Sequence, residues 1–425
     1  MIPVVITTAR GAGAVTRNAQ DIERGATGPR APDPSLRFPT YLRHCRRQRR
    51  LSLRQVEKLS EEYPERVSNS YLAYCETGRL LPALGKLITL ARVFGLPLQS
   101  FTERIEMDQE RVVAPDLGPG ATWRQMRAAG ITEAEAGRLT AAHVCFEKAL
   151  TMAAGDGDGD AETDLKIDLA IVLKRMSRHY IARDLLEEVV SRKVLDPARI
   201  DRALILLADV FREMGKLTLA AMIGREAMQR ATRLGDRTKE AHAACLVGNA
   251  LFDMGDIADA IPLYEKAVRF FRENGDTASL VCNMANLANC LARDARGARF
   301  NEGIRLLSEA ETLARRMGFN RQIADIYCYL GQAYILHGSH ARAEKLFFQS
   351  NQIARPAGYH DIHFSNTWFL REIAAKFGRA ADAAGHMKTL RHLRGRVENT
   401  NPEVRAYDRM TGPDGGDDNR ENANA

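Results

Sequence analysis

Apolar residues recur at helical spacing in five short stretches between residues 36 and 105. In PALGKLITLARVFG, the apolar residues Leu84, Leu87 and Ala91 follow one another at three or four positions, and a glycine ends the pattern. This spacing places the side chains on one face of a helix. A second stretch, SLRQVEKLSEEY, begins with Ser52, a residue type that caps helix starts. The pattern predicts a small five-helix domain over residues 36–105.

A longer unit with the same spacing repeats after residue 121. Glycine turns separate its two helices, and Gly215 and Gly255 stand 40 residues apart, as do Gly338 and Gly378. A period of about 34 to 45 residues with paired amphipathic helices is typical of a helical solenoid. We therefore expect an all-α fold, with about seven helix pairs in a solenoid over residues 121–398.

Three stretches carry no helical pattern. Residues 1–35 include GATGPRAPDPS, residues 106–120 read EMDQERVVAPDLGPG, and residues 399–425 include TGPDGGDDNRENANA. We expect the first and last to be disordered tails and the middle one to be a linker. The first stretch also contains VVITTARGAGAVT. Because Thr16 takes the place of the third glycine of a dinucleotide-binding loop, we favour a tail there.

The positive charge of the chain is concentrated in the predicted five-helix domain. The formal net charge is +7, and the segment from Arg37 to Arg104 holds 13 lysines and arginines against 6 aspartates and glutamates. The charges of the remaining residues therefore nearly cancel. A local basic surplus on a small domain suits a polyanion such as double-stranded DNA, although a solvated basic face has the same composition.

The number and spacing of the cysteines indicate a reducing compartment. They stand far apart, at positions 45, 75, 145, 245, 282, 290 and 328, and none forms a Cys-x-x-Cys pair. An odd number at such spacing favours reduced thiols and a cytoplasmic protein. No run of 18 apolar residues occurs, so we expect no membrane span.

The stretch VSNSYLAYCETGRL predicts a short helix with a polar outer face. Leu72 and Cys75 are three residues apart and therefore face inward together. The residues that then face outward are Asn69, Ser70, Ala73 and Tyr74. A helix that serves only to fill a core does not require small polar residues at its tip. The outer face is therefore a candidate recognition surface.

Residues 38–101 resemble the helix-turn-helix domain of the Cro/repressor type, the XRE family. The resemblance rests on SLRQV, VSNSYLAYCETGRLLP and LARVFGLPLQSF. In that family the second helix of the motif enters the DNA major groove, and its first residues contact base edges. The resemblance implies base contacts from Asn69, Ser70, Ala73 and Tyr74, and contacts to the DNA backbone from Arg79, Arg43 and Arg54. The alternative for each side chain is a solvated surface residue.

Two features depart from the family pattern. Leu53 stands where many relatives have a glutamine that binds a phosphate, and the link SEEYPERVS is several residues longer than the usual turn. The link also holds Glu61, Glu62 and Glu65, which a phosphate repels. We expect the two-helix geometry to survive because both helices keep their apolar faces, and the docking angle on DNA stays open.

The second unit resembles tetratricopeptide repeats. AHAACLVGNALFDMGDIADAIPLYEKAV carries the small residue of the family, Gly248, its turn glycine, Gly255, and the alanines Ala260 and Ala267. Such repeats form a superhelix whose concave face is lined by the first helix of each pair. The resemblance implies that a column of polar residues, mostly six positions before a glycine turn, faces this groove: Asp209, Asn249, Asn289, Gln332 and Glu372. Flanking candidates are Arg202, His242, Phe252, Arg293 and Trp368. The column suits bonds to a peptide backbone or bonds between helices.

Other patterns carry little chemistry. DGDGDAETD, at 156–164, resembles a calcium loop but has Ala161 at the central glycine and Ile167 at the closing glutamate. His360 and His363 can share a helix face, but no third ligand stands nearby. No nucleophile elbow, P-loop or zinc motif occurs. We therefore expect no metal, no cofactor and no enzymatic activity.

Together these patterns favour a DNA-binding transcription regulator. In known regulators that combine these domains, the repeats bind a signal peptide and dimerise the protein. The resemblance therefore implies a homodimer and a peptide or protein effector in the repeat groove. The alternative is a protein-interaction scaffold whose small domain docks to a protein or binds DNA weakly and without sequence preference. The small, polar outer face of the 67–80 helix favours the regulator.

Overall fold

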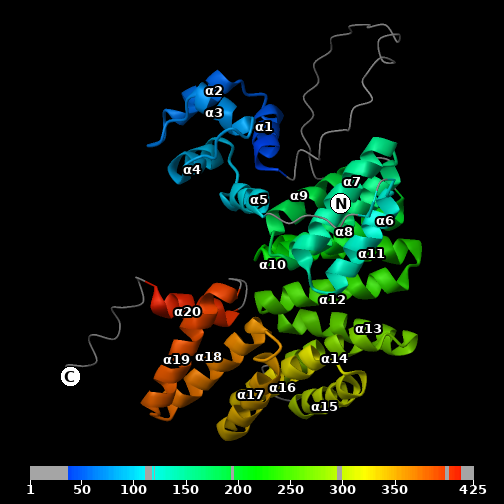
Figure 1. Ribbon diagram of the computed structural model, residues 1–425. Helices are drawn as coiled ribbons and strands as arrows, with labels where there is room; N and C mark the ends of the chain where they lie inside the picture. Colours follow the sequence, from blue (N-terminus) through cyan, green and yellow to red (C-terminus); the bar gives the residue numbers. More distant parts are fainter. Residues whose placement is uncertain are drawn as a thin grey trace, which may run out of the picture.

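Helix pairs form a curved solenoid, and a five-helix unit lies at its N-terminal end (Figure 1). The computed structural model describes residues 37–110, 117–118, 120–192, 196–293, 299–397 and 402–412. Every regular element in these ranges is helical, which confirms the predicted all-α fold. The curvature brings the five-helix unit and the last helix, α20, to the borders of the same open side of the molecule (Figure 1).

The N-terminal unit folds around one apolar core. Its helices are α1 (Phe38–Gln48), α2 (Leu53–Ser60), α3 (Asn69–Glu76), α4 (Leu84–Val93) and α5 (Gln99–Gln109). Phe38, Leu72 and Phe101 have no exposed surface and meet in this core. Ser52 begins α2 with a capping box: its hydroxyl accepts the backbone N–H of Gln55, and the Gln55 side chain accepts the N–H of Ser52. The five predicted helices are confirmed.

Within the described ranges, the solenoid has seven helix pairs, as the repeat predicted. They are α6 (Trp123–Glu135) and α7 (Leu139–Asp156), α8 (Gly159–Arg175) and α9 (His179–Ser191), α10 (Pro197–Glu213) and α11 (Leu217–Leu234), α12 (Arg237–Met254) and α13 (Ile257–Asn274), α14 (Thr277–Arg293) and α15 (Phe300–Met317), α16 (Asn320–Leu336) and α17 (His340–Ala354), and α18 (His360–Lys376) and α19 (Ala380–Leu393). Gly255 ends α12 with a φ of 91°, a backbone conformation that glycine adopts without strain. Gly331 lets two helices of a pair approach closely, because a Cβ atom there would lie 2.6 Å from the ring of Phe347.

The predicted linker over residues 106–120 is wrong at its start. Helix α5 continues to Gln109, and Met107 is buried in the apolar core of the first repeats. Most residues of this stretch are polar, so the sequence did not indicate that Met107 packs on the first repeats. Residues 111–116 and 119 lie outside the described residues.

The predicted disordered tail over residues 399–425 is also wrong in part, because helix α20 spans Pro402–Thr411. Its buried side chains Val404 and Tyr407 pack on Phe364 of α18, with the Tyr407 and Phe364 rings 5.7 Å apart, edge to face. Burial of this apolar stripe stabilises the helix. Residues 413–425 and the predicted N-terminal tail over residues 1–35 lie outside the described part of the chain.

The N-terminal unit is fixed to the solenoid by polar contacts between α5 and α9. The Glu103 carboxylate accepts the backbone N–H groups of Tyr180 (2.9 Å) and Ile181 (3.1 Å), so α5 caps the start of α9. Arg104 of α5 has no exposed surface and donates to Asp184 of α9 at 2.7 Å. Side-chain contacts between α5 and α9 therefore join the two units.

A buried histidine of α7 makes stability depend on pH. His143 of α7 is 5% exposed, and burial, with a smaller effect of the Arg37 charge, lowers its pKa to about 4. The unfolded chain has an ordinary histidine pKa of about 6.5, so between these values it binds a proton that the folded chain does not. The free energy of unfolding is therefore expected to fall by roughly 3 kcal/mol as the pH drops from 7 to 4. Urea unfolding at a series of pH values measures this. A His143→Gln variant should lose that part of the pH dependence, and an unchanged dependence would contradict the assignment.

Candidate functional site

Helix α3 presents a polar face to solvent. Ser68 caps it by accepting the N–H of Tyr71 at 3.2 Å, and Leu72 and Cys75 are fully buried on the inner side. The four residues assigned to the outer face are the exposed Ser70 and Tyr74 and the half-buried Asn69 and Ala73. Tyr74 is 50% exposed, and the Ser70 hydroxyl donates to the Asn69 side chain at 3.1 Å. The short polar groups therefore stand together at the N-terminal tip of the helix.

The three arginines assigned to the DNA backbone differ in their surroundings. Arg54 and Arg79 are exposed. Arg43 instead donates to the carbonyl of Glu76 at 3.0 Å and lies 3.6 Å from its carboxylate. Glu76 is buried and accepts two bonds from Arg46, at 2.6 and 2.7 Å. A phosphate contact by Arg43 therefore competes with an internal contact between α1 and α3, which the sequence did not indicate.

The long link between α2 and α3 is anchored at both ends. Val67 has no exposed surface, and its N–H donates to the Ser60 hydroxyl at 2.9 Å. Arg66 lies 3.0 Å from the carboxylate of Glu57 and 3.2 Å from that of Glu61. The extra residues therefore leave the two helices packed on one core, and one arginine offsets part of the acidic charge.

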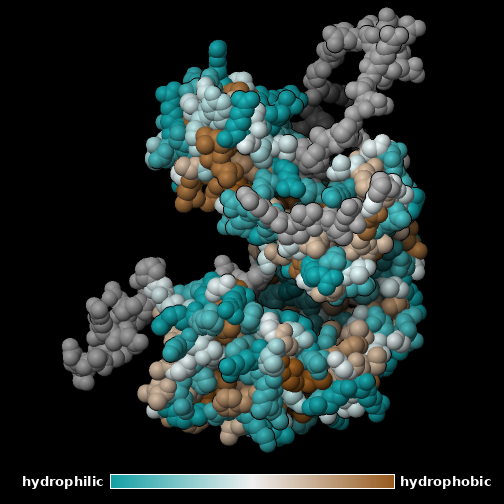
Figure 2. All heavy atoms as spheres, viewed as in Figure 1, coloured by the Kyte–Doolittle hydropathy of each residue, from teal (hydrophilic) through white to brown (hydrophobic). Residues whose placement is uncertain are grey.

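An apolar edge follows α3. Leu80, Leu81 and Leu84 are 39%, 49% and 65% exposed. Apolar surface is visible on this unit in Figure 2. Exposed leucines at consecutive positions are uncommon on a monomer surface and are typical of contact regions. The N-terminal unit therefore has two neighbouring surfaces of different chemistry, one polar and one apolar.

The concave side of the solenoid encloses a cavity of about 1360 Å³. Figure 2 shows the molecule hollowed on this side. We call this cavity the groove. Four predicted residues line it: Phe252, Asn289, Arg293 and Gln332. Asn249 lines an adjoining cavity of about 220 Å³ together with Phe252 and Asn289.

The other predicted groove residues lie elsewhere. Arg202 and His242 line a separate pocket of about 480 Å³. Glu372 is exposed beside Arg371 and does not line the groove. Trp368 packs among the apolar residues under α20, so its assignment to the groove is wrong. The error follows from the wrong tail prediction. Because helix α20 was not predicted, the sequence did not indicate that this helix packs on Trp368.

Part of the polar column is occupied by bonds between helices. Asp209 pairs with Lys174 of α8 and with Arg212, and the charges of these two outweigh burial and hold the pKa of Asp209 below its usual range. Asn249 accepts the Tyr264 hydroxyl at 2.7 Å and the Asn286 amide at 3.2 Å. At these two positions the column has the structural role that the sequence left open.

Arg293 brings four predicted groove residues together from three helices. Its Nε donates to Asn289 Oδ1 at 3.1 Å, and its Nη2 donates to Gln332 Oε1. The guanidinium carbon lies 5.3 Å from the centre of the Phe252 ring, within cation–π range. The guanidinium is therefore held in one plane at the wall of the groove.

Several charged groove residues were missed by the sequence analysis. Arg212, Arg321 and Asp325 all line the groove. Burial, reinforced by Asp361 and opposed by Arg321, raises the pKa of Asp325 to about 7. Asp325 stands seven residues before Gln332 and Arg212 three after Asp209, so both share a helix face with the predicted column. The predicted flanking residues Phe252 and His242 stand at the same two spacings from Asn249, so these spacings, applied to every repeat, would have indicated Arg212 and Asp325.

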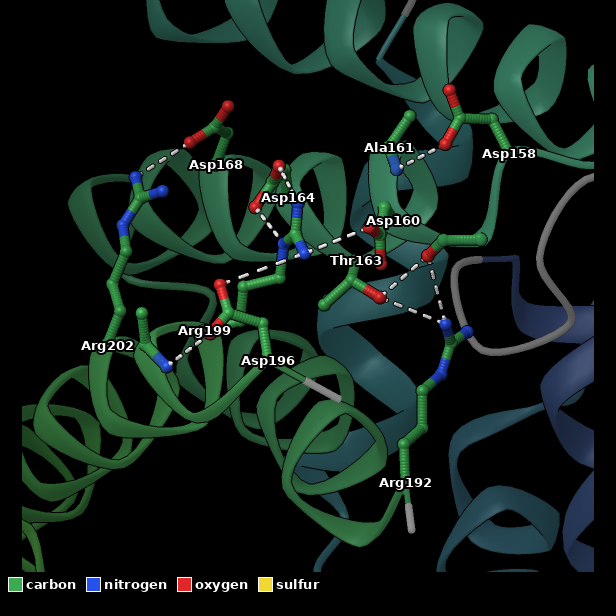
Figure 3. A network of polar contacts seen from close by, with 12 residues as sticks. Asp158, Asp160, Ala161, Thr163, Asp164, Asp168, Arg192, Asp196, Arg199 and Arg202 are labelled. Carbon is green, nitrogen blue, oxygen red and sulfur yellow. Dashed lines mark hydrogen bonds and ion pairs between the residues drawn. The ribbon is translucent and has the colours of Figure 1, made fainter. Parts of the chain in front are cut away.

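The acidic residues from Asp158 to Asp168 cap α8 and form ion pairs with α10 (Figure 3). Asp158 caps α8 by accepting the N–H of Ala161 at 3.0 Å. Asp164 holds Arg199 of α10 at 2.9 and 3.1 Å, and Asp168 holds Arg202 at 2.8 Å. Within the described ranges, no group of three or more histidine, cysteine, aspartate or glutamate residues is arranged to hold a metal ion. The acids therefore tie α8 to α10.

Two family models match parts of the chain. A model described as a helix-turn-helix domain matches residues 38–101, and one described as a tetratricopeptide repeat matches residues 199–273. The N-terminal unit is a helix-turn-helix domain, and the solenoid contains tetratricopeptide repeats. Neither model describes a catalytic domain. No curated protein sequence matches the chain. In the part of the chain that the structure describes, no helix has the length and apolar character that a membrane crossing requires.

Solved structures with the same kind of solenoid are similar to this chain. The apo form of RapI has a TM-score of 0.54 and 10% identity, covering 64% of this chain and 98% of that one. Aspartyl phosphate phosphatase F from Bacillus subtilis has a TM-score of 0.54 and 12% identity, covering 92% and 98%. A Rap protein complexed with Competence and Sporulation Factor has a TM-score of 0.53 and 12% identity, covering 84% and 98%. At these identities the likeness shows the fold alone.

Proposed function

We propose that this protein is a sequence-specific transcription regulator of the XRE type that reads DNA with α3. The observation that carries the proposal is the outer face of α3, where Asn69, Ser70 and Tyr74 face solvent while Leu72 and Cys75 hold the helix to the core. A helix fits the major groove, where asparagine can bond adenine through two contacts and serine can bond several bases. Arg79 and Arg54 then contact phosphates on either side.

The groove binds a peptide or protein effector in this proposal. Its volume of about 1360 Å³ exceeds that of most small-molecule sites, and its wall combines amides, aromatic rings and charged groups. The similar Rap protein is complexed with Competence and Sporulation Factor, which supports an effector role for this kind of solenoid. No catalytic role is proposed for either unit.

The regulator acts as a homodimer in the cytoplasm. Two helix-turn-helix units that read a two-fold symmetric site must place their recognition helices about 34 Å apart, one turn of DNA. The exposed edge of Leu80, Leu81 and Leu84 beside α3 supports self-association of the N-terminal units. An effector changes DNA binding only if it favours one arrangement of the dimer over another.

Salt-dependent DNA binding tests the proposal against the scaffold alternative. The alternative is favoured by the internal pairing of Arg43, which leaves fewer arginines free for phosphates. Affinities for random DNA and for genomic fragments are measured from about 50 to 200 mM salt, a range in which phosphate contacts weaken strongly. A regulator retains at least a roughly thousand-fold preference for some fragments. Equal affinity for all fragments at every salt concentration would favour the scaffold. A monomer at micromolar concentration, with and without a selected fragment, would remove the dimer.

A further inference from the structure

Arg293 differs in its partners from Lys174, Arg212 and Arg321, three other cations that line the groove. Lys174 and Arg212 pair with Asp209, and Arg321 pairs with Asp361. Arg293 donates only to the neutral side-chain amides of Asn289 and Gln332, and within the described residues it forms no ion pair. Among the described residues that line the groove, Arg293 is therefore an arginine whose charge has no carboxylate in contact.

The setting of Arg293 prepares it to bind an anion. The guanidinium is half-buried, its Nε and Nη2 donate to the two amides, and Nη1 donates to no acceptor in the described part of the chain. The contact with the Phe252 ring fixes its plane. A guanidinium held in this way loses little conformational freedom when it binds, and its fork matches the two oxygens of a carboxylate.

The surrounding charges favour a singly charged anion. Glu403 of α20 lines the same groove and accepts the Ser365 hydroxyl at 3.1 Å. Burial raises the pKa of Glu403, and the charge of Arg293 opposes this shift. Asp253 and Asp325 also line the groove. These acidic groups repel a doubly charged phosphate more strongly than a carboxylate.

We propose that Arg293 binds a carboxylate group of the effector peptide. The proposal rests on the proposed function of the groove as a peptide site. The carboxylate comes from the C-terminus of the peptide or from an aspartate or glutamate side chain. Glu403 repels that carboxylate when ionised, so removing its charge strengthens binding.

Affinity selection with the full chain tests this proposal. Purified protein is incubated with three random heptapeptide libraries, and bound peptides are identified by mass spectrometry. The libraries have free C-termini with all residue types, amidated C-termini with all residue types, and amidated C-termini without Asp or Glu. The wild type is expected to enrich peptides at least ten-fold more from the libraries that contain carboxylates. Enrichment confined to the library with free C-termini identifies the terminal carboxylate. Enrichment from the amidated library that contains Asp and Glu identifies a side-chain carboxylate.

Variants separate the role of Arg293 from the general quality of the fold. Arg293→Gln is expected to abolish the enrichment, Arg293→Lys to weaken it by losing the fork, and Glu403→Gln to increase it. The control Arg316→Gln changes an exposed arginine on α15 and should behave as wild type. Thermal unfolding followed by circular dichroism shows whether each variant is folded. If Arg293→Gln does not fold, Arg293→Lys and the comparison of the libraries test the carboxylate contact.

The outcomes distinguish the two proposals. Equal enrichment from all three libraries, or wild-type enrichment by Arg293→Gln, would overturn the carboxylate contact and leave the peptide groove standing. If the wild type enriches no peptide from any library, the proposed effector function of the groove fails, and this inference fails with it.

Discussion

Replacing Arg104 by alanine is expected to lower the free energy of unfolding by about 3 kcal/mol. Arg104 is among the largest fully buried side chains of the protein. It donates to the Ser100 carbonyl at 2.6 Å and to Asp184 at 2.7 Å, and its guanidinium carbon lies 3.5 Å from the centre of the Tyr41 ring. Alanine removes these contacts together and leaves a cavity between α5 and α9.

The measurement is urea unfolding of the full chain, followed by circular dichroism. Asp184 keeps its contact with Arg183, which limits the loss to less than that of an orphaned buried charge. Arg47→Ala, at an exposed position of α1, is the matched control and should change stability by less than about 0.5 kcal/mol. A similarly small loss in Arg104→Ala would contradict the view that this arginine fixes the helix-turn-helix domain to the solenoid.

A variant that combines Asn69→Ala and Ser70→Ala is expected to lose sequence discrimination. Each lost base contact lowers affinity for the selected site by about 1–3 kcal/mol, so we expect a loss of at least about thirty-fold for the pair. Binding to random DNA should change little, because these short side chains reach bases rather than phosphates. The helix itself is preserved, since its cap is Ser68.

Arg79→Ala is the contrasting variant for this prediction. It should weaken binding to selected and random duplexes alike. The negative slope of log affinity against log salt should become less steep by about one. Fluorescence anisotropy with both kinds of duplex, at several salt concentrations, measures all of these quantities. If Asn69→Ala with Ser70→Ala weakens both duplexes equally, these residues do not read bases.

The helical architecture was predictable because local signals repeat along the chain. Glycine turns, such as Gly215 and Gly255 at a 40-residue spacing, and apolar stripes mark most of the helix pairs, and Gly255 occupies the left-handed conformation that such a turn requires. The buried side of α3 followed from the three-residue spacing of Leu72 and Cys75. These features depend on residues near one another in sequence, which periodicity describes well.

Contacts between distant segments were not predictable in the same way. Nothing in the sequence indicates that Arg43 bonds to Glu76, 33 residues away. Helix α20 looked like a disordered tail because its few apolar residues gain a partner only when α18 lies beneath them. The groove was predicted in part, since flanking positions were named only in some repeats, whereas ion pairs such as that of Arg212 with Asp253 join one repeat to the next.

Genome-wide immunoprecipitation tests the central claim, that α3 reads specific DNA, most directly. Tagged wild type is compared with an Asn69→Ala/Arg79→Ala variant that is expressed at the same level. The account predicts sharp wild-type peaks that share a two-fold symmetric motif, with half-sites about one helical turn apart, and the loss of these peaks in the variant. Diffuse peaks, or the same profile for both proteins, would contradict it.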